Sequence, residues 1–368
     1  MTQANETGLR RLENDTVGIL IAGETNIQDR DDPVSAFAGV RDALKDADIR
    51  FCHLEGPLCE PSADTENPDI PHKLTWRHSD PRMVNALLDA GIDAVSCASN
   101  VTYPASAALR SSQVLRSAGI PFAGVGANRA EARAPAIVER NGVRLGVLSY
   151  TSVFWPSRHA AEDDAPGTSV LRARTAYEPG RRALEMPGAP PEVRTWLDAG
   201  EIDGLQDDVR RLAGQVDIVM ASCHWGVSSS PEPVEYQRII ARAAIEAGAH
   251  VVIGHHPHVI QPIEFHQGRP IFYSLGNFVF DWPKMRDRHK DGMMLRLDIA
   301  NGQIARIRLA PVMRNAGNQV GMLNPDTGDG ARIVARIREL SGNAIRLDRG
   351  TGDLVLTDPA RAQRAAAE

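Results

Sequence analysis

An apolar run that ends in three histidines is the feature that most constrains the fold of this chain. Residues 249–253 (Ala-His-Val-Val-Ile) have the composition of a buried strand, and residues 254–258 (Gly-His-His-Pro-His) follow it directly. In α/β proteins the chemistry sits at the carboxyl ends of strands. Pro257 fixes its own φ and restricts its predecessor, so His256 and His258 can point at one cation. The segment predicts a strand that ends at a metal site; the alternative is a surface loop rich in histidine.

Composition sets the class of protein. The chain has 368 residues, 42% of them hydrophobic, which allows a sizeable core without disulfides. Its formal net charge is -6, and the basic residues are scattered among acids, so nucleic acid is not an expected partner. The widely spaced cysteines indicate reduced thiols. Residues 1–15 are polar and no stretch approaches the roughly 20 apolar residues of a membrane span. We therefore expect a cytoplasmic protein without membrane association.

Apolar strand-like segments alternate with helical patterns along most of the chain, which predicts an α/β fold. The other expected strands are 17–22, 49–54, 93–98, 121–124, 218–223 and 271–277, and the expected helices are 34–44, 83–88, 106–118, 201–214, 234–248 and 328–341. Turn dipeptides at Asn141-Gly142 and Asn301-Gly302 predict two antiparallel hairpins.

The predicted domain organisation is simple. We expect one domain over residues 16–320, preceded by a polar tail at 1–15. Residues 321–368 are expected to add a helix and a tail packed on the same domain. Between about 155 and 200 the chain is rich in Pro, Ala, Arg and Asp without clear periodicity, which predicts a long irregular insertion. Such insertions often cover an active site.

Polar side chains recur at five predicted strand ends. Divalent ions such as Zn²⁺, Mn²⁺ or Fe²⁺ accept nitrogen and oxygen ligands, and two ions about 3.5–4 Å apart can ionise a bridging water. Alone, each histidine or asparagine has an ordinary structural interpretation, whereas a carboxylate is costly to bury without a partner. The repeated placement favours a shared site for two ions, with these candidate ligands: Glu24, Asn26, His53, Glu55, Asn100, His224, His256 and His258.

Four motifs resemble the CapA family, which is named for poly-γ-glutamate capsule biosynthesis and is related to calcineurin-like metallophosphoesterases. They are residues 52–57 (Cys-His-Leu-Glu-Gly-Pro), 224–226 (His-Trp-Gly), 254–258, and 273–278 (Tyr-Ser-Leu-Gly-Asn-Phe). The resemblance spans roughly residues 17–281. It implies a four-layer αββα sandwich of metallophosphoesterase type with a metal centre between the two sheets. It places the family's first acidic position on Glu24, its bridging carboxylate on Glu55, and its later histidines on His224, His256 and His258.

The chain departs from the family pattern at two motifs. Gly23-Glu24 stands where the family usually has Gly-Asp, and Val101 stands where its Asn-Asn-His block has the histidine. In the wider superfamily that histidine is often the proton donor or a phosphate contact, so we expect its loss to disfavour phosphoester cleavage. The capsule proteins also generally carry an N-terminal membrane anchor, whereas this chain begins with a short polar tail. Capsule synthesis is therefore not carried over.

The leading functional hypothesis is a metal-dependent hydrolase that acts on a small amide, lactam or γ-glutamyl-type substrate. A metal-bridging hydroxide would attack, and His255 or His159 would protonate the leaving group. Trp155, Trp225 and Asn277 are the candidate substrate contacts. The alternatives are a calcineurin-like phosphoesterase and a non-catalytic module that binds a metal or a polymer. The oligomeric state is not predicted.

Overall fold

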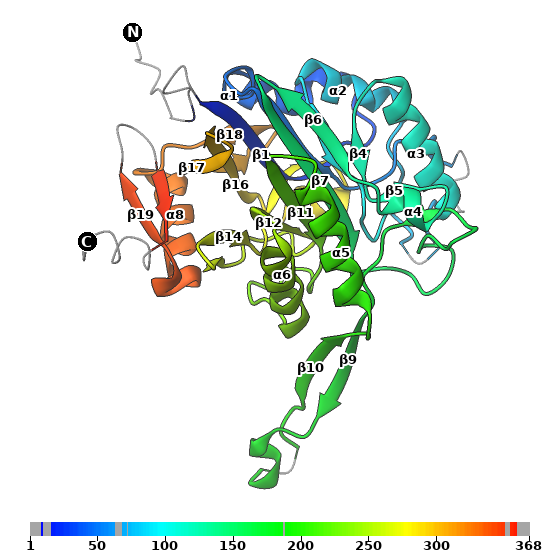
Figure 1. The fold of residues 1–368 in the computed structure, drawn as a ribbon, viewed down its shortest axis with the longest axis vertical. Coiled ribbons are helices and arrows are strands. Elements are labelled where there is room, and N and C mark those ends of the chain that lie inside the picture. The colour runs from blue at the N-terminus through cyan, green and yellow to red at the C-terminus, as the bar shows by residue number, and fades with distance from the viewer. Residues whose placement is uncertain are drawn as a thin grey trace.

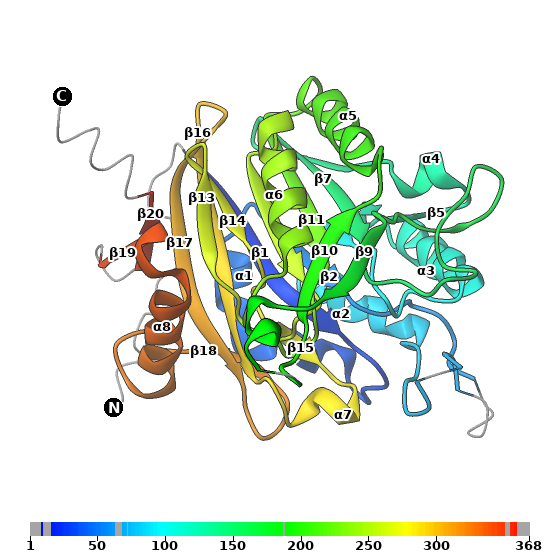
Figure 2. The same cartoon turned by 90° about the horizontal axis from the view of Figure 1, so that it is seen from below.

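The computed structural model describes residues 9, 16–62, 68–71, 73–186, 188–349 and 354–358. The tail predicted at 1–15 lies outside them apart from Leu9, and so does the end of the chain after residue 358. Two large β-sheets form the body of the protein, with helices on their outer faces (Figures 1 and 2).

The larger sheet has ten strands in the order β19-β20-β17-β16-β1-β2-β3-β4, with β15 also paired to β1 and β18 to β17. Strands β1 to β4 run parallel, and β15 is parallel to β1. The strands are β1 (Val17–Asn26), β2 (Ile49–Leu54), β3 (Ala94–Ser96), β4 (Phe122–Ala123), β15 (Asn277–Phe280), β16 (Asp291–Ala300), β17 (Gln303–Arg314), β18 (Val320–Met322), β19 (Arg346–Arg349) and β20 (Leu354–Thr357).

The smaller sheet has six strands in the order β13-β14-β12-β11-β7-β6. Its four central strands are parallel, and the two outer ones are antiparallel to their neighbours. These strands are β6 (Ala136–Arg140), β7 (Val143–Thr151), β11 (Ile218–His224), β12 (Val251–His255), β13 (Ile263–His266) and β14 (Arg269–Phe272).

Alternate residues of the larger sheet belong to two different layers of the core. Ile19, Ile21 and Phe51 pack between the sheets, while Leu20 and Cys52 pack outward against helices. This period of two is what a strand buried on both faces requires. The outer layer consists of the 3₁₀ helices η1 (Pro33–Val40) and η2 (Pro81–Met83) and the helices α1 (Arg41–Lys45), α2 (Val84–Asp89) and α3 (Ala105–Ser117).

The smaller sheet has the same construction. Ile218 and Met220 face the inter-sheet core, and Val219 and Ala221 face the outer cluster. That cluster is covered by α5 (Glu201–Ala213) and α6 (Glu235–Ala247). Helix, sheet, sheet and helix thus form four layers, which confirms the predicted αββα sandwich and its mixed α/β class.

The C-terminal helix α8 (Gly328–Ser341) joins the same core. Ile333, Val334 and Ile337 on one of its faces are buried in the inter-sheet cluster. A short 3₁₀ helix, η4 (Gly342–Ala344), follows it. Within the described ranges, no helix has the length and apolarity needed to cross a membrane.

Both predicted hairpins are present, because Asn141 and Gly142 have φ of 50° and 78°, and Asn301 and Gly302 have φ of 52° and 70°. The strand predicted at 271–277 is instead divided between the two sheets. β14 ends at Phe272, and β15 begins at Asn277 in the larger sheet. Gly276 makes the crossing with φ of 74°, where a Cβ atom would lie 2.7 Å from the Asp291 carbonyl oxygen.

The segment predicted as irregular contains a β-hairpin that projects from the body of the molecule (Figure 1). Its strands are β9 (Ala173–Glu178) and β10 (Glu192–Leu197), joined through the 3₁₀ helix η3 (Arg181–Leu184). Both strands are largely exposed, so their sequence lacks the apolar alternation that marks a strand. Short elements complete the fold: β5 (Val125–Gly126) pairs with β8 (Gly167–Thr168), and α4 (Arg129–Ala132) and α7 (Pro283–Arg286) are single turns.

Candidate metal centre

The carboxyl ends of parallel strands from both sheets meet at one place. In the larger sheet the register pairs Glu24 with His53 and with Asn277 on either side. In the smaller sheet it pairs His224 with His255. Because the sheets stack with these ends on the same side, side chains far apart in the sequence share one buried space between them.

Two carboxylates and one imidazole form the centre of this space. One oxygen each of Glu24 and Glu55 and one nitrogen of His258 all lie within 4.8 Å of one another. The Nδ1 atom of His258 is 2.6 Å from Oε2 of Glu24 and 3.9 Å from Oε2 of Glu55. Asn277 Oδ1 lies 3.0 Å from the same nitrogen. Among the described residues, no other group of three metal-ligating side chains comes this close.

Several buried atoms around these residues have no hydrogen-bond partner. A buried polar atom left in this way costs about 1–3 kcal/mol, so native proteins rarely gather them. These atoms mix carboxylate, amide and imidazole donors, which is the set that a borderline divalent cation accepts. They are Oε2 of Glu55, Nε2 of His53, Oδ1 of Asn100, Nε2 of His224, both ring nitrogens of His255 and Nδ1 of His256, whereas Oε2 of Glu24 has only the ion-pair contact with His258. The residues present fit a metal centre.

Hydroxyl groups hold two of the imidazoles by their other nitrogen. His53 Nδ1 lies 2.9 Å from Ser96 Oγ, which also accepts a hydrogen bond from Ser222 Oγ at 2.8 Å. His224 Nδ1 lies 3.2 Å from Thr151 Oγ1. In metal-binding histidines such a contact fixes the ring so that the remaining nitrogen faces the ion. The sequence carries no signal for these hydroxyl groups, because only the folded sheets bring them to the histidines.

Burial sets the charge of the cluster. It lowers the pKa of His53, His224 and His256 well below the usual histidine value, so these rings are neutral at pH 7 and able to ligate. It raises the pKa of Glu24, and it raises that of Glu55 further, because the Glu24 charge adds to the effect of burial. A cation between the two carboxylates would offset both the burial of these charges and their mutual repulsion.

Asn26 makes two structural hydrogen bonds. Its Nδ2 donates to the Glu55 carbonyl oxygen at 2.9 Å, and its Oδ1 accepts from the Trp282 backbone N–H at 3.1 Å. The amide is therefore engaged at both ends and positions the Glu55 segment. Asn100 differs, since its Oδ1 is buried and without a partner.

The two histidines predicted as proton donors lie in different surroundings. His159 Nδ1 accepts from the Trp155 N–H at 2.9 Å, and His159 Nε2 lies 3.0 Å from the Ser99 carbonyl oxygen. Both nitrogens are engaged, and burial lowers the pKa of His159 to about 4. His255 stacks on His53 with ring centroids 4.3 Å apart, and burial lowers the pKa of His255 to about 3. Both rings are neutral at pH 7.

The predicted substrate contacts are dispersed. Asn277 touches His258, as described above, and Trp155 is half-buried and donates from Nε1 to the Asn100 carbonyl oxygen at 2.9 Å. Trp225 is 0% exposed and packs in the outer cluster of the smaller sheet, where its Nε1 donates to the Tyr273 carbonyl oxygen at 2.9 Å. The structure thus brings Asn277 into the cluster and Trp155 to its edge, and it places Trp225 behind the sheet.

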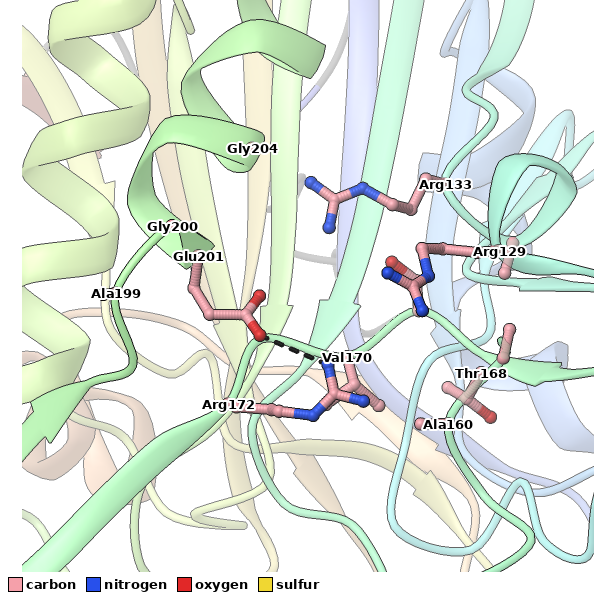
Figure 3. A pocket seen from close by; sticks show the side chains of 13 residues that line it. Arg129, Arg133, Ala160, Thr168, Val170, Arg172, Ala199, Gly200, Glu201 and Gly204 are labelled. Carbon is pink, nitrogen blue, oxygen red and sulfur yellow. Dashed lines mark hydrogen bonds and ion pairs between the residues drawn. The ribbon is translucent and has the colours of Figure 1, made fainter. Parts of the chain in front are cut away.

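A pocket of about 320 Å³ opens at the start of α5 (Figure 3). Three arginines from different segments line it, and each is paired with a carboxylate. Arg129 lies 2.6 Å from Glu162, Arg133 lies 2.7 Å from Asp208, and Arg172 lies 3.3 Å from Glu201. None of the residues that line this arginine pocket belongs to the histidine and carboxylate cluster.

The chain belongs to the bacterial capsule synthesis protein PGA_cap family, whose family model matches residues 15–282. This membership confirms the resemblance seen in the motifs. The chain is 27% identical over 255 residues to the capsule biosynthesis protein CapA of Bacillus anthracis, covering 68% of this chain and 55% of that protein. It is 53% identical over 73 residues to the PGA biosynthesis protein CapA of Bacillus subtilis, covering 19% of each.

A probable polyglutamine synthesis accessory protein of Mycobacterium tuberculosis is 28% identical over 207 residues, with 54% of this chain and 49% of that protein covered. The chain thus spans about half the length of several curated relatives. Among solved structures, a phosphatase from Mycoplasma pneumoniae aligns with a TM-score of 0.41 and 9% identity, covering 95% of this chain and 96% of that one. The protein TT1561 of Thermus thermophilus aligns with a TM-score of 0.33 and 10% identity, covering 76% and 94%.

Proposed function

We propose that this protein is a metal-dependent hydrolase that cleaves a small amide, lactam or γ-glutamyl-type substrate at the histidine and carboxylate cluster between the two sheets. One observation carries the proposal: buried carboxylate, amide and imidazole atoms from several strand ends converge there without hydrogen-bond partners. Native proteins rarely leave a group of this kind without a ligand, and its donors suit divalent ions.

The residues divide into two groups around Glu55. Glu24, Glu55 and His258 are close enough to share one ion. His53, Asn100, His224 and His256 also carry partnerless atoms and would hold a second ion. Bound divalent ions supply Lewis acidity and ionise a coordinated water near neutral pH. The neutral imidazoles can ligate without first losing a proton. His255, stacked against His53, stays our candidate for proton transfer, and His159 is assigned to positioning the 99–100 segment.

Amide cleavage is favoured over phosphoester cleavage by the residue beside Asn100. Val101 is 0% exposed and packs in an apolar cluster with Trp76 and Trp282, so no imidazole is offered at that position. The family's capsule and polyglutamate names fit an amide substrate as well. A cytoplasmic location and a small-molecule substrate stay predictions of the sequence.

The test is turnover by the purified protein loaded with Mn²⁺ or Zn²⁺, assayed against a γ-glutamyl amide panel and a generic phosphodiester. We expect amide hydrolysis that a chelator and His256→Ala both abolish. His266→Ala is the matched control, because His266 pairs with Glu246 on the surface. Phosphodiester turnover alone would instead identify a phosphoesterase. Absence of any turnover at full metal occupancy would identify a binding module.

A further inference from the structure

A lysine that the sequence analysis did not single out lies over two tryptophan rings next to the Glu55 segment. Lys73 Nζ lies 4.8 Å from the ring centroid of Trp76 and 4.5 Å from that of Trp282. The two rings meet edge to face with centroids 5.6 Å apart, and both are buried. The ammonium group is thus held between two aromatic faces, an arrangement that attracts a cation but accepts no strong hydrogen bond from it.

Hydrogen bonds fix this seat and tie it to the candidate metal centre. The Lys73 N–H donates to the Ile70 carbonyl oxygen at 2.9 Å, and Trp282 Nε1 donates to that of Thr75 at 3.1 Å. The Trp282 backbone N–H in turn donates to Asn26, whose amide holds the Glu55 segment. The Trp282 residue under the ammonium is therefore linked through Asn26 to the Glu55 backbone.

The two tryptophans adjoin the Glu55 segment, and among the described residues they offer the lysine no charged partner. A Cβ atom built on Gly56, the residue after Glu55, would lie 3.0 Å from Trp76 Cζ2, so the Trp76 ring under the ammonium packs against the Glu55 segment. Among the described residues, however, Lys73 forms no ion pair and no side-chain hydrogen bond. Its three N–H donors are free for a ligand.

The net charge of the site indicates which kind of ligand it attracts. Glu24 and Glu55 together carry -2 when ionised, so one divalent cation between them already brings the sum to zero. The second ion of the proposed function would make the sum positive, and the Lys73 ammonium would add a further +1. A site of that sign attracts an anionic group and repels a cationic one.

We propose that Lys73, held between Trp76 and Trp282, is an anion-binding subsite that takes a carboxylate or phosphoryl group of the substrate beside the metal centre. The inference rests on the proposed function and adds the substrate class to it: the substrate carries a negative charge close to the bond that is cleaved.

The experiment measures the binding of inorganic phosphate and of glutarate to the Mn²⁺-loaded protein by calorimetry. We expect Lys73→Met to weaken binding of the preferred anion by about tenfold or more, because a charge-assisted contact is lost. Lys73→Arg should retain most of the affinity, and Lys45→Met, at an exposed lysine, should leave it unchanged. Preference for glutarate would identify a carboxylate ligand, and preference for phosphate a phosphoryl ligand. Equal affinity in wild type and Lys73→Met, or no binding of either anion, would overturn the proposal.

A second measurement needs no variant. Either anion should slow chemical acetylation of Lys73 in the wild-type protein, as read by mass spectrometry, while Lys45, Lys284 and Lys290 serve as internal controls. Unchanged modification of Lys73 at saturating anion would contradict the subsite. These readouts are independent of turnover: anion binding that depends on Lys73 without any hydrolysis would sink the proposed function alone, and hydrolysis with Lys73-independent binding would sink the subsite alone.

Discussion

The arginine pocket at α5 and the histidine and carboxylate cluster between the sheets both gather charged groups, and they satisfy them to different degrees. In the arginine pocket each guanidinium has a carboxylate within 3.3 Å, as Figure 3 shows for Arg172 and Glu201, although Nη2 of Arg133 is buried without a hydrogen-bond partner. Asp208 also accepts a hydrogen bond from the Tyr150 hydroxyl at 2.9 Å. In the cluster, Glu55 and the imidazoles of His53, His224 and His256 keep buried atoms without partners.

The difference separates a structural role from a functional one. Removing one member of a buried ion pair leaves an uncompensated charge, so paired groups are needed for stability. Partnerless buried groups weaken the fold, and their presence indicates a ligand that completes them. Changes in the arginine pocket should therefore affect folding, whereas changes in the cluster should affect binding.

The largest expected effect is on metal affinity. Glu55→Gln and His256→Ala should each weaken Mn²⁺ binding by about 1,000-fold, since loss of a ligand exceeds the 10–100-fold cost of losing an outer-shell partner. Equilibrium dialysis against Mn²⁺ measures this. Arg133→Met in the arginine pocket should leave metal affinity unchanged. Equal Mn²⁺ affinity in all three variants would contradict the assignment of metal binding to the cluster and not to the arginine pocket.

The next effect is the pH dependence of stability in the metal-free protein. The pKa of His159 is lowered to about 4 in the folded state, so between pH 6.5 and 4 the unfolded chain binds the extra proton and stability falls as pH falls. Full loss of this contribution amounts to about 3 kcal/mol. Urea unfolding in EDTA from pH 7.5 to 4.5 should show a shallower slope for His159→Gln than for wild type. Identical slopes would contradict the assignment of a neutral, buried His159.

A smaller effect is expected from breaking an ion pair. The Arg133 and Asp208 side chains are 19% and 7% exposed, so Arg133→Met should lower the free energy of unfolding by about 2 kcal/mol. Arg129, 45% exposed, is the matched control, and Arg129→Met should change it by less than about 1 kcal/mol. Urea denaturation at pH 7.5 compares the two. A larger loss for Arg129→Met would mean that burial does not determine the value of these pairs.

The smallest expected effect is a gain in the free energy of unfolding. The pKa of Glu55 is raised by burial and by Glu24, so its ionised form destabilises the metal-free protein as pH rises above the usual carboxyl value. Glu55→Gln should therefore stabilise the protein by about 1 kcal/mol in EDTA at pH 7.5. With Mn²⁺ in excess, Glu55→Gln should instead be less stable than the wild-type protein. A variant less stable than wild type in EDTA would show that Glu55 supports the fold.

The sequence predicts the location of those residues that stand at the end of a strand. Glu24, Glu55, His224 and His258 stand at or just after the ends of parallel strands, and these ends must meet at one edge. The elements that carry no strong local pattern could not be found in this way. Lys73 lies in a segment without periodicity, and its place between two tryptophans depends on contacts more than 200 residues apart in the chain.

Two details of the fold could not be predicted from local sequence patterns either. The β9–β10 hairpin is too exposed to carry a strand pattern. The run at 271–277 is continuous in sequence but is shared between two sheets, because a glycine turns the chain in the middle of it. Trp225 follows a histidine of the cluster directly, yet successive side chains point to opposite sides, and it packs behind the sheet.

Anomalous diffraction from crystals grown with Mn²⁺ or Zn²⁺ tests the central claim most directly. The account predicts a peak within coordination distance of Glu24, Glu55 and His258, which should disappear in Glu55→Gln. Metal-saturated crystals without a peak at these three residues would contradict it.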